Sequence, residues 1–365
     1  ITSIKADTIN DSRNVPTLLV TVTTSNGVSG VCMVPSGAST GASEAYELRD
    51  DGTSHGAVTK AIEIINTTIN ETLIGKDVAN QKEIDSLMCT LDGTTNKQKL
   101  GGNSILGVSV ACAKAAAKAE GKEFFEHLRS LSDSTVGASH PSLYFNLING
   151  GKHANTKLAF QEYHIVPKTE KISEALEIAE RVQEALGEIL KEKYGEVPRG
   201  DEGGYAVPTE NIREPLELLM EAAKKCGLEN DIHLALDVAA TSFYDSATGM
   251  YTIGSEVHTP EELHDTYLSL AESFPMISIE DPFQEEDFES FTKLQAALPE
   301  MIIVGDDITV TNVTLVKKAL ELKSISGLIV KPNQIGSVSE TIDTIKYAQD
   351  NGIKCIVSHR SGETM

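Results

Sequence analysis

Five short apolar runs decide the fold of this chain: IHLALD (232–237), MISIED (276–281), IIVGDD (302–307), GLIVK (327–331) and CIVSHR (355–360). They fall in the stretch that runs from His233, the second residue of the first run, to Thr364, and each ends in residue types that bind metal or move protons. Runs of four to six residues rich in Ile and Val are typical of strands buried on both faces. The polar ends are therefore expected at the ends of buried strands.

Helical patterns separate these runs, for example Thr311–Leu322 and Ser339–Asp350. A strand and a helix repeating at roughly 25 to 30 residues indicate βα units in a parallel sheet. In a closed barrel of such units, function gathers at the carboxyl ends of the strands. The charged residues of this chain fall at that edge.

Residues 1 to about 130 do not follow this period. A hairpin is predicted from the runs 16–24 and 28–34, with a third strand in 1–9, and helices are predicted over 57–73, 80–91 and 105–119. Strands followed by helices favour a small α+β domain. We therefore expect an N-terminal α+β capping domain over residues 1–135 and a catalytic β/α barrel domain over residues 136–365, beginning with a strand at 143–148.

The charge of −23 makes nucleic acid and anionic membranes unlikely partners, although a bound metal could still admit a small anionic substrate. The five scattered cysteines include no C-x-x-C pair, and no secretory signal or membrane span is visible. These features predict a cytoplasmic protein.

Three strand-end carboxylates, Asp237, Glu280 and Asp306, form an oxygen-only set that favours Mg²⁺ over zinc. Helix capping or ion pairing is the alternative for any one of them. Lys331 ends the next strand, and a lysine among cations can lose its proton near pH 7 and act as a base. Such a base beside Mg²⁺ could remove a proton next to a carboxylate.

Two glycine-containing turns carry further candidates, His153 in NGGKHA (149–154) and Glu202 in GDEGG (200–204), and the run FQEYHIVP (160–167) carries Glu162. Taken singly, each of the two turns is more often an ordinary surface feature. As a set, they offer an acid, Glu202 with Glu162 close by, to expel a leaving group. Arg360 and Ser361 could hold a phosphate or carboxylate.

At these residues the chain resembles the enolase family. The motifs that carry the resemblance, in family order, are VPSGASTG (34–41), EAYELRD (44–50), LDGTTNKQKLGGNSILGVS (91–109), NLINGGKHA (146–154), QE (161–162), GDEGG (200–204), ALDVAA (235–240), SIEDPF (278–283), VGDDITVTN (304–312), VKPNQIGS (330–337) and SHRSGET (358–364). The resemblance covers nearly the whole chain. It implies an enolase-like (β/α)8 barrel and reversible Mg²⁺-dependent dehydration of 2-phosphoglycerate to phosphoenolpyruvate.

Position by position, the resemblance implies that Asp237, Glu280 and Asp306 bind a first magnesium and that Ser39 helps to bind a second, which arrives with substrate. Lys331 would take the C2 proton, and Glu202 would assist departure of the C3 hydroxyl, with Glu162 and His153 beside it. The substrate would be gripped by His359, Arg360 and Ser361. A homo-oligomer, a dimer or an octamer, is also implied.

Four places depart from the family pattern, and none is a proposed ligand. Asn14-Val15 interrupts DSRGNP, Thr241-Ser242 replaces Ser-Glu, His164 replaces a hydrophobic residue after QEY, and Val207 is inserted in GGFAP. Family members also continue for about fifty residues beyond SGET, two βα units, with the eighth strand and a second active-site lysine. A chain ending at Met365 is therefore expected to have little activity on its own.

Two other functions remain open at this point. An acid-sugar dehydratase of the same superfamily would share the chemistry, although the SHRSG segment and the Ser39 loop argue against it. A catalytically inactive enolase-like protein that keeps the fold for binding or assembly, or a truncated fragment, is the other.

Overall fold

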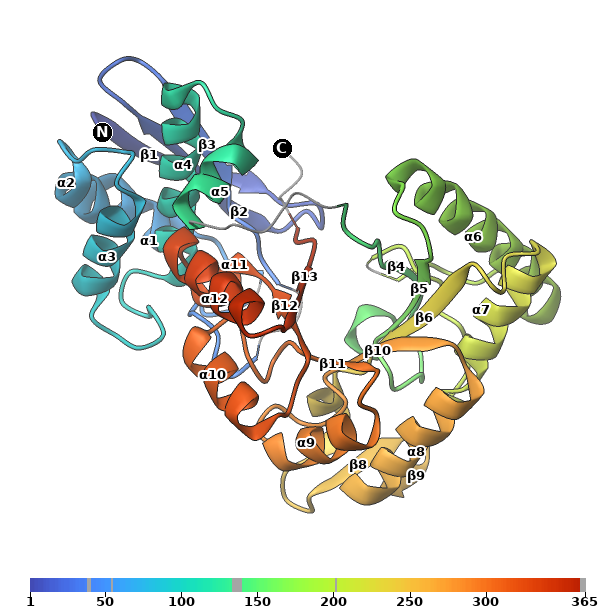
Figure 1. Ribbon diagram of the computed structural model, residues 1–365. Helices are drawn as coiled ribbons and strands as arrows, with labels where there is room; N and C mark the ends of the chain where they lie inside the picture. The colour runs from blue at the N-terminus through green and yellow to red at the C-terminus, as the bar shows by residue number, and fades with distance from the viewer. Residues whose placement is uncertain (38–40, 54, 133–139, 201, 362–365) are drawn as a thin grey trace. The chain divides into compact units, whose positions relative to one another are not determined.

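The computed structural model describes residues 1–37, 41–53, 55–132, 140–200 and 202–361 (Figure 1). The chain forms two compact units. Unit 1 contains residues 1–136, 309–317 and 328–365, and unit 2 contains residues 137–308 and 318–327. Unit 1 therefore joins the N-terminal part of the sequence to segments near its end.

The N-terminal part of unit 1 is an antiparallel sheet covered by helices. Its elements are β1 (Ser3–Asn10), β2 (Pro16–Thr23), β3 (Ser29–Met33), α1 (Thr59–Ile64), a π-helical turn (Ile65–Ile69), α2 (Asn70–Leu73), α3 (Gln81–Asp92), α4 (Gly102–Glu120) and α5 (Phe124–Ser132). β2 lies between β1 and β3. The predicted α+β arrangement and its hairpin are confirmed.

Helix α4 packs on the sheet through small residues. A Cβ on Gly30 of β3 would lie 2.0 Å from the backbone oxygen of Ala111, and one on Gly107 would lie 2.7 Å from Val20. The two glycines thus allow helix and sheet to approach closely. The alanine-rich face of α4 is buried in the same apolar core.

The region predicted as one helix over 57–73 contains the π-helical turn instead. Asn66 and Asn70 accept hydrogen bonds from the backbone N–H groups of Ala6 and Ile4, each at 2.8 Å. Those N–H groups belong to the edge strand β1. The turn therefore serves to cover an exposed sheet edge.

The later segments of unit 1 carry part of the barrel. They contain β12 (Gly327–Val330, from Leu328), α11 (Pro332–Ile335), α12 (Val338–Asp350) and β13 (Lys354–Val357), with β13 next to β12. The N-terminus of α12 docks on buried side chains of α3 and α4. Asp85 accepts a hydrogen bond from Ser339 N–H at 2.9 Å, and Ser109 accepts one from Val338 N–H at 3.0 Å.

Unit 2 contains five neighbouring strands in the order β4-β5-β6-β10-β11. Their bounds are β4 (Phe145–Asn149), β5 (Glu162–Pro167), β6 (Ile232–Asp237), β10 (Met276–Glu280) and β11 (Ile302–Gly305). The predicted parallel pairing holds for β6, β10 and β11. β5 instead runs antiparallel to both β4 and β6. The connection from β4 to β5 holds only a short 3-10 turn (Gly151–His153), without the helix that usually connects parallel strands.

Helices and a small sheet complete unit 2: α6 (Ile172–Tyr194), α7 (Glu214–Lys225), a 3-10 turn (Ala240–Phe243), β7 (Tyr244–Asp245), β8 (Met250–Ile253), β9 (Glu256–His258), α8 (Pro260–Ser273) and α9 (Phe288–Ala297). Helix α10 (Val313–Leu322) spans the boundary of the units. In Figure 1, α6 and α7 lie beside β5 and β6. Buried aromatic rings, including Phe160, Tyr251 and Phe283, form a contiguous group in this unit.

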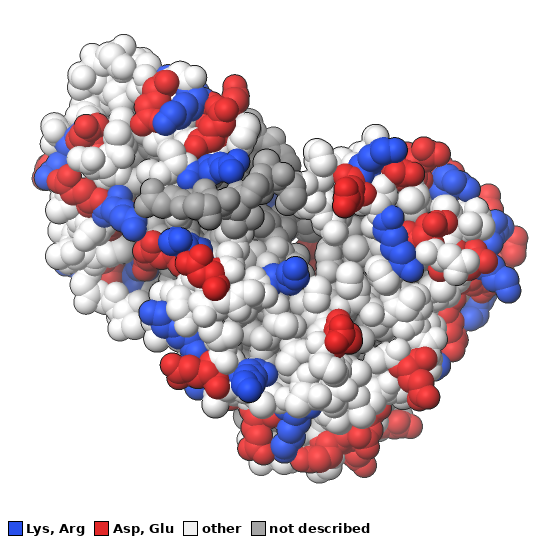
Figure 2. Space-filling model, viewed as in Figure 1, with Lys and Arg blue, Asp and Glu red and all other residues white. Residues whose placement is uncertain are grey.

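The surface carries charges of both signs. In Figure 2, Asp and Glu are spread over the visible face with Lys and Arg among them, and the basic side chains do not gather in one patch there. Among the described helices, none combines the length and the apolar character needed to cross a bilayer.

Candidate active site

The strand ends of unit 2 bring carboxylates together. Glu280 at the end of β10 pairs in register with Asp237 at the end of β6, and Asp237 pairs with Glu162 at the start of β5. Asp306 follows β11 directly. Asp237 is buried and accepts a 2.8 Å hydrogen bond from the amide of Gln161. The predicted carboxylates therefore lie at one edge of the sheet.

Asp281 ends the apolar run MISIED, and no role was predicted for it from the sequence. It is buried, and its two carboxylate oxygens accept hydrogen bonds from the N–H groups of Asp306 (2.8 Å) and Asp307 (2.7 Å). Burial and the nearby charges of Asp307 and Asp306 raise the pKa of Asp281 well above its ordinary value. Asp281 thus fixes the backbone that carries Asp306. The sequence signal for this contact was the pair Asp306-Asp307 directly after a strand, with Asp306 25 residues beyond Asp281.

The backbone at this edge is strained. Asp281 has a φ of 40° and Ala239, two residues after Asp237, a φ of 46°. Left-handed conformations cost a non-glycine residue about 1–3 kcal/mol and cluster at functional sites. The strain occurs where β6 and β10 deliver their carboxylates.

Carboxylates gather at this edge of the sheet in a group that could hold a cation. Ligand atoms of Asp281, Asp306 and Asp307 all lie within 4.8 Å of one another, one of two such groups among the described residues; the other is His153, Glu162 and Glu202. The set predicted from sequence (Asp237, Glu280, Asp306) is not itself one of these two groups, although the strand register places its first two members side by side. Carboxylate oxygens at a buried sheet edge are the ligands that Mg²⁺ prefers.

His153, Glu162 and Glu202 meet in space although they are far apart in the sequence. Nδ1 of His153 lies 3.0 Å from Oε1 of Glu162 and 3.7 Å from Oε1 of Glu202. Burial alone would lower the pKa of His153, but the contact with the Glu162 carboxylate and the charge of Glu202 outweigh it and raise that pKa. The predicted acid group is therefore assembled within unit 2.

Two further polar residues support this group. The amide of Asn146 on β4 donates a 3.1 Å hydrogen bond to Oε2 of Glu202. Nε2 of His164 lies 2.8 Å from Oε2 of Glu162. Asn146 stands in the NLINGG motif, and His164 lies two residues after Glu162. Both positions could have suggested a site residue, but no role was predicted for either.

Glycines of the GDEGG loop permit a close approach of two segments. A Cβ on Gly200 would lie 2.6 Å from the backbone oxygen of His153, and one on Gly204 would lie 2.3 Å from Oδ1 of Asn149. These glycines place the Glu202 loop against the turn that carries His153, a contact that was not predicted from the sequence.

In unit 1, Lys331 follows β12 and its backbone is fixed on both sides. Its N–H donates to Oγ1 of Thr311 at 2.9 Å, and its carbonyl accepts from Gln334 N–H at 2.9 Å. Thr311 Oγ1 also donates to the side chain of Gln334 at 3.0 Å. The backbone from which the Lys331 side chain extends is therefore held by hydrogen bonds on both sides.

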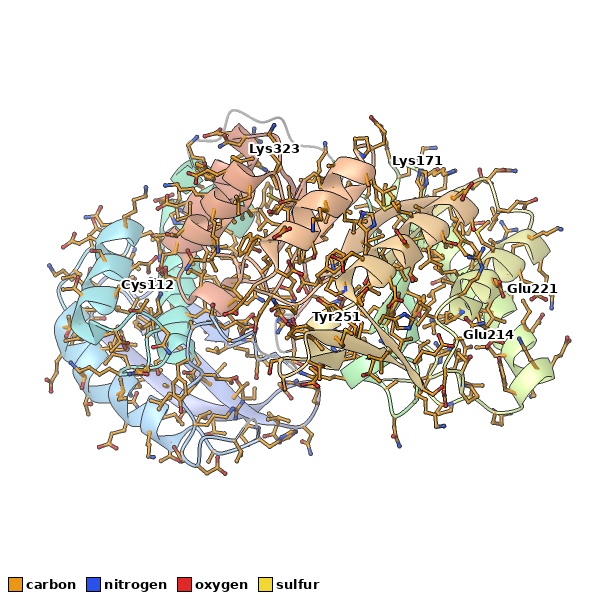
Figure 3. All side chains as sticks on the ribbon, turned by 90° about the horizontal axis from the view of Figure 1, so that it is seen from below. Cys112, Lys171, Glu214, Glu221, Tyr251 and Lys323 are labelled. Carbon is orange, nitrogen blue, oxygen red and sulfur yellow. The ribbon has the colours of Figure 1, made fainter. Side chains whose placement is uncertain are left out.

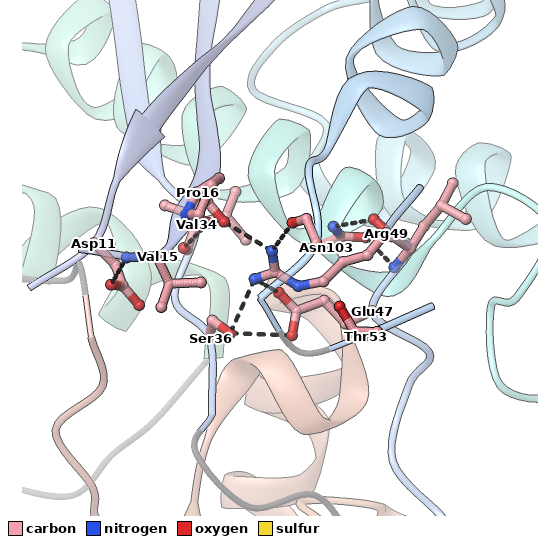
Figure 4. Close-up of polar contacts among 12 residues, drawn as sticks. Asp11, Val15, Pro16, Val34, Ser36, Glu47, Arg49, Thr53 and Asn103 are labelled. Atoms are coloured by element: carbon pink, nitrogen blue, oxygen red, sulfur yellow. Dashed lines mark hydrogen bonds and ion pairs between the residues drawn. The ribbon is translucent and has the colours of Figure 1, made fainter. Parts of the chain in front are cut away.

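The loop that carries Ser39 follows Ser36, whose side chain makes polar contacts with its neighbours (Figure 4). Ser36 donates a 3.0 Å hydrogen bond to Glu47, and buried Arg49 forms a 2.8 Å ion pair with the same carboxylate. Ser361 pairs with Ser36 through a β-bridge and lies next to Arg360. His359 is exposed at the same end of the chain. Ser39 itself lies outside the described residues.

The chain was compared with known families. Residues 1–128 match the family described as "Enolase, N-terminal domain", and residues 137–365 match "Enolase, C-terminal TIM barrel domain". The barrel fold class predicted from the sequence is thereby confirmed.

Curated relatives give the same result. The chain is 44% identical to the enolase of Methanocaldococcus jannaschii, 45% identical to that of Methanothrix thermoacetophila and 40% identical to that of Sulfolobus acidocaldarius. Each comparison covers 100% of this chain and 86% of the relative. Both domains and the sequence identity over the full chain lead to one conclusion: this chain belongs to the enolase family.

Proposed function

We propose that Lys331 and Glu202 are the base and the acid of the enolase reaction in this chain. The reaction follows from family membership: the chain is a phosphopyruvate hydratase, a magnesium-dependent lyase that interconverts 2-phosphoglycerate and phosphoenolpyruvate. The single observation that carries the assignment of the acid is the convergence of Glu202 and Glu162 on His153.

Asp237, Glu280 and Asp306 hold the first magnesium in this proposal, and Ser39 contributes to a second. The register that pairs Glu280 with Asp237 and the oxygen-only chemistry of the three side chains support the first site. Bound magnesium stabilises the negative charge that develops when the C2 proton leaves, which brings a weakly acidic C–H within reach of a lysine base. Asp281 keeps Asp306 in place through the backbone.

The chain's own residues then divide the proton transfers. Lys331, on its fixed backbone, takes the C2 proton. Glu202 donates a proton to the departing C3 hydroxyl, and Asn146 orients the Glu202 carboxylate. Glu162 and His153 lie beside the departing C3 hydroxyl and bind the substrate there. His359, Arg360 and Ser361 grip the substrate, with the Arg360 guanidinium on its phosphate.

The test is formation of the enol-phosphate absorbance from 2-phosphoglycerate and Mg²⁺ by protein that contains this chain. We expect Lys331→Ala and Glu202→Gln each to lower kcat by at least 100-fold, because each substitution removes the group that takes up or donates a proton in the reaction. Lys171→Ala, on an exposed lysine that is labelled in Figure 3, is the matched control. Near-normal activity of either active-site variant would remove that residue from its role.

We also propose that the protein works in the cytoplasm, which its five free cysteines support. It assembles as a homodimer or as a multiple of one such as an octamer, as the family resemblance implies. The N-terminal capping domain covers residues 1–135 and the barrel domain residues 136–365.

A further inference from the structure

Position 164 is where the chain departs from its family next to the acid group. The enolase resemblance implies a hydrophobic residue after QEY, and this chain has His164. Glu162 and His164 are two residues apart on β5, so their side chains leave the same face of the strand. The histidine therefore points to the side on which Glu162 works.

The two side chains are in direct contact. Nε2 of His164 lies 2.8 Å from Oε2 of Glu162, while Oε1 of the same carboxylate lies 3.0 Å from Nδ1 of His153. Glu162 thus stands between two imidazole rings, with one oxygen toward each. Both rings are buried: His164 is 9% exposed and His153 is 7% exposed. A contact that is shielded from water in this way defines the orientation of a carboxylate more strictly than a surface contact.

A packing role alone does not account for the histidine. Its ring makes an edge contact with Tyr144, which a hydrophobic residue could also make. Its second nitrogen, Nδ1, is buried and has no hydrogen-bond partner within the described part of the chain. Burying such a nitrogen costs free energy. The contact with Glu162 is the compensating interaction of the ring.

We propose that His164 is a positioning residue that fixes Oε2 of Glu162 and so presents Oε1 to His153 and Glu202. The inference rests on the proposed function of Glu162 beside the acid. Nε2–H of His164 donates and the ionised carboxylate accepts. With one oxygen fixed, the carboxylate keeps the rotamer in which its other oxygen meets His153.

The surrounding charges are consistent with this role. Burial alone would raise the pKa of Glu162, but His153 and His164 outweigh it and keep that pKa well below its ordinary value. The other titratable groups near the pair are Tyr144 before β4, Asp237 on β6 and Glu202 on its loop. His164 Nε2 is hydrogen-bonded to Oε2 of Glu162, and His153 Nδ1 lies 3.0 Å from Oε1 as an ion-pair neighbour.

The experiment compares His164→Met, which restores a family-like hydrophobic side chain, with His164→Gln, whose amide can still donate. We expect kcat for 2-phosphoglycerate to fall about 10- to 100-fold in H164M with KM changed less than threefold, because a misplaced group costs rate more than binding. H164Q should recover most of the loss. His264→Gln, which changes a histidine of α8, is the control.

A second readout does not depend on activity. In protein with ¹⁵N-labelled histidine, without substrate or Mg²⁺, the ring signals of His153 should shift in H164M and stay near their original positions in H164Q. Unchanged His153 signals and unchanged kcat in H164M would overturn the proposal, as would equal losses in both variants. If Glu162→Gln keeps full activity while the His153 signals still respond to H164M, the proposed function of Glu162 fails and the positioning contact stands.

Discussion

At the scale of single residues, the buried carboxyl of Asp281 illustrates how a site depends on groups that touch no substrate. Asp281→Ala would leave the N–H groups of Asp306 and Asp307 without their acceptors. We expect Mg²⁺ affinity to fall about 10- to 100-fold. Titration calorimetry with Mg²⁺ measures this, and Asp265→Ala, on an 81% exposed side chain, is the control. Equal affinity in the Asp281 variant would show that the loop holds its shape unaided.

Lys331 allows a sharper test than loss of turnover. In Lys331→Ala, exchange of the C2 proton of 2-phosphoglycerate with solvent deuterium should cease, because the proposed base is gone. Mg²⁺ binding should stay within threefold of the original value, because the carboxylates remain. Proton NMR follows the exchange. Exchange at the normal rate in this variant would show that another group is the base.

Glu214 gives a prediction about pH. Burial would raise its pKa, but contacts with Lys193, Thr209 and Tyr194 outweigh it and lower the pKa of Glu214 to about 2, from an ordinary 4.5. A depressed folded-state pKa stabilises the protein above the unfolded value, and that stabilisation is lost as the pH falls from about 4.5 toward 2. The difference in unfolding free energy between the original protein and Glu214→Gln should therefore shrink from pH 6 to pH 3.

Urea unfolding at several pH values measures this difference. Glu221→Gln is the matched control, because Glu221 is exposed on the same helix α7 (Figure 3). A pH-independent difference for Glu214→Gln, or the same pH dependence in the control, would contradict the assignment of the lowered pKa to these contacts.

At the scale of elements, Ser109 joins three helices of unit 1. Its Oγ accepts hydrogen bonds from Val338 N–H of α12 and from the Gln81 amide of α3, both at 3.0 Å. Ser109→Ala leaves two buried donors without this acceptor, so we expect a loss of about 2 kcal/mol in unfolding free energy. Chemical denaturation tests this, with Ser86→Ala on the exposed face of α3 as the control. A change below 0.5 kcal/mol would mean that these donors find other acceptors.

The elements also show where sequence patterns succeed. The five apolar runs became β6, β10, β11, β12 and β13. Strands β6, β11 and β12 are mostly buried, which agrees with the strands buried on both faces that an unbroken apolar run predicts. The prediction is wrong for β13, which has no buried residue and carries Val357 with 74% of its surface exposed. The direction of β5 and the π-helical turn at Ile65–Ile69 were not predicted. Both depend on partners distant in sequence: β5 pairs with β4 and β6, and Asn66 pairs with β1.

At the scale of the whole molecule, Mg²⁺ should stabilise the fold, because a ligand that binds only the folded state lowers its free energy. At a hundredfold excess over the dissociation constant, the gain is about 2.7 kcal/mol. Thermal unfolding with Mg²⁺ and with a chelator measures it. Asp237→Asn should abolish most of the difference, and Asp265→Asn should keep it. An equal shift in both variants would place the stabilising ion elsewhere.

Local patterns and motif order were enough to predict the family and the barrel strands, and they supplied the candidate site residues. Asp237, Glu280 and Lys331 were all located by where an apolar run ends. Which side chains meet became clear from the folded chain: Asp281 holds the Asp306 backbone, and Glu162 stands between His153 and His164. Such contacts join positions on different strands and loops, and chain folding fixes their distances.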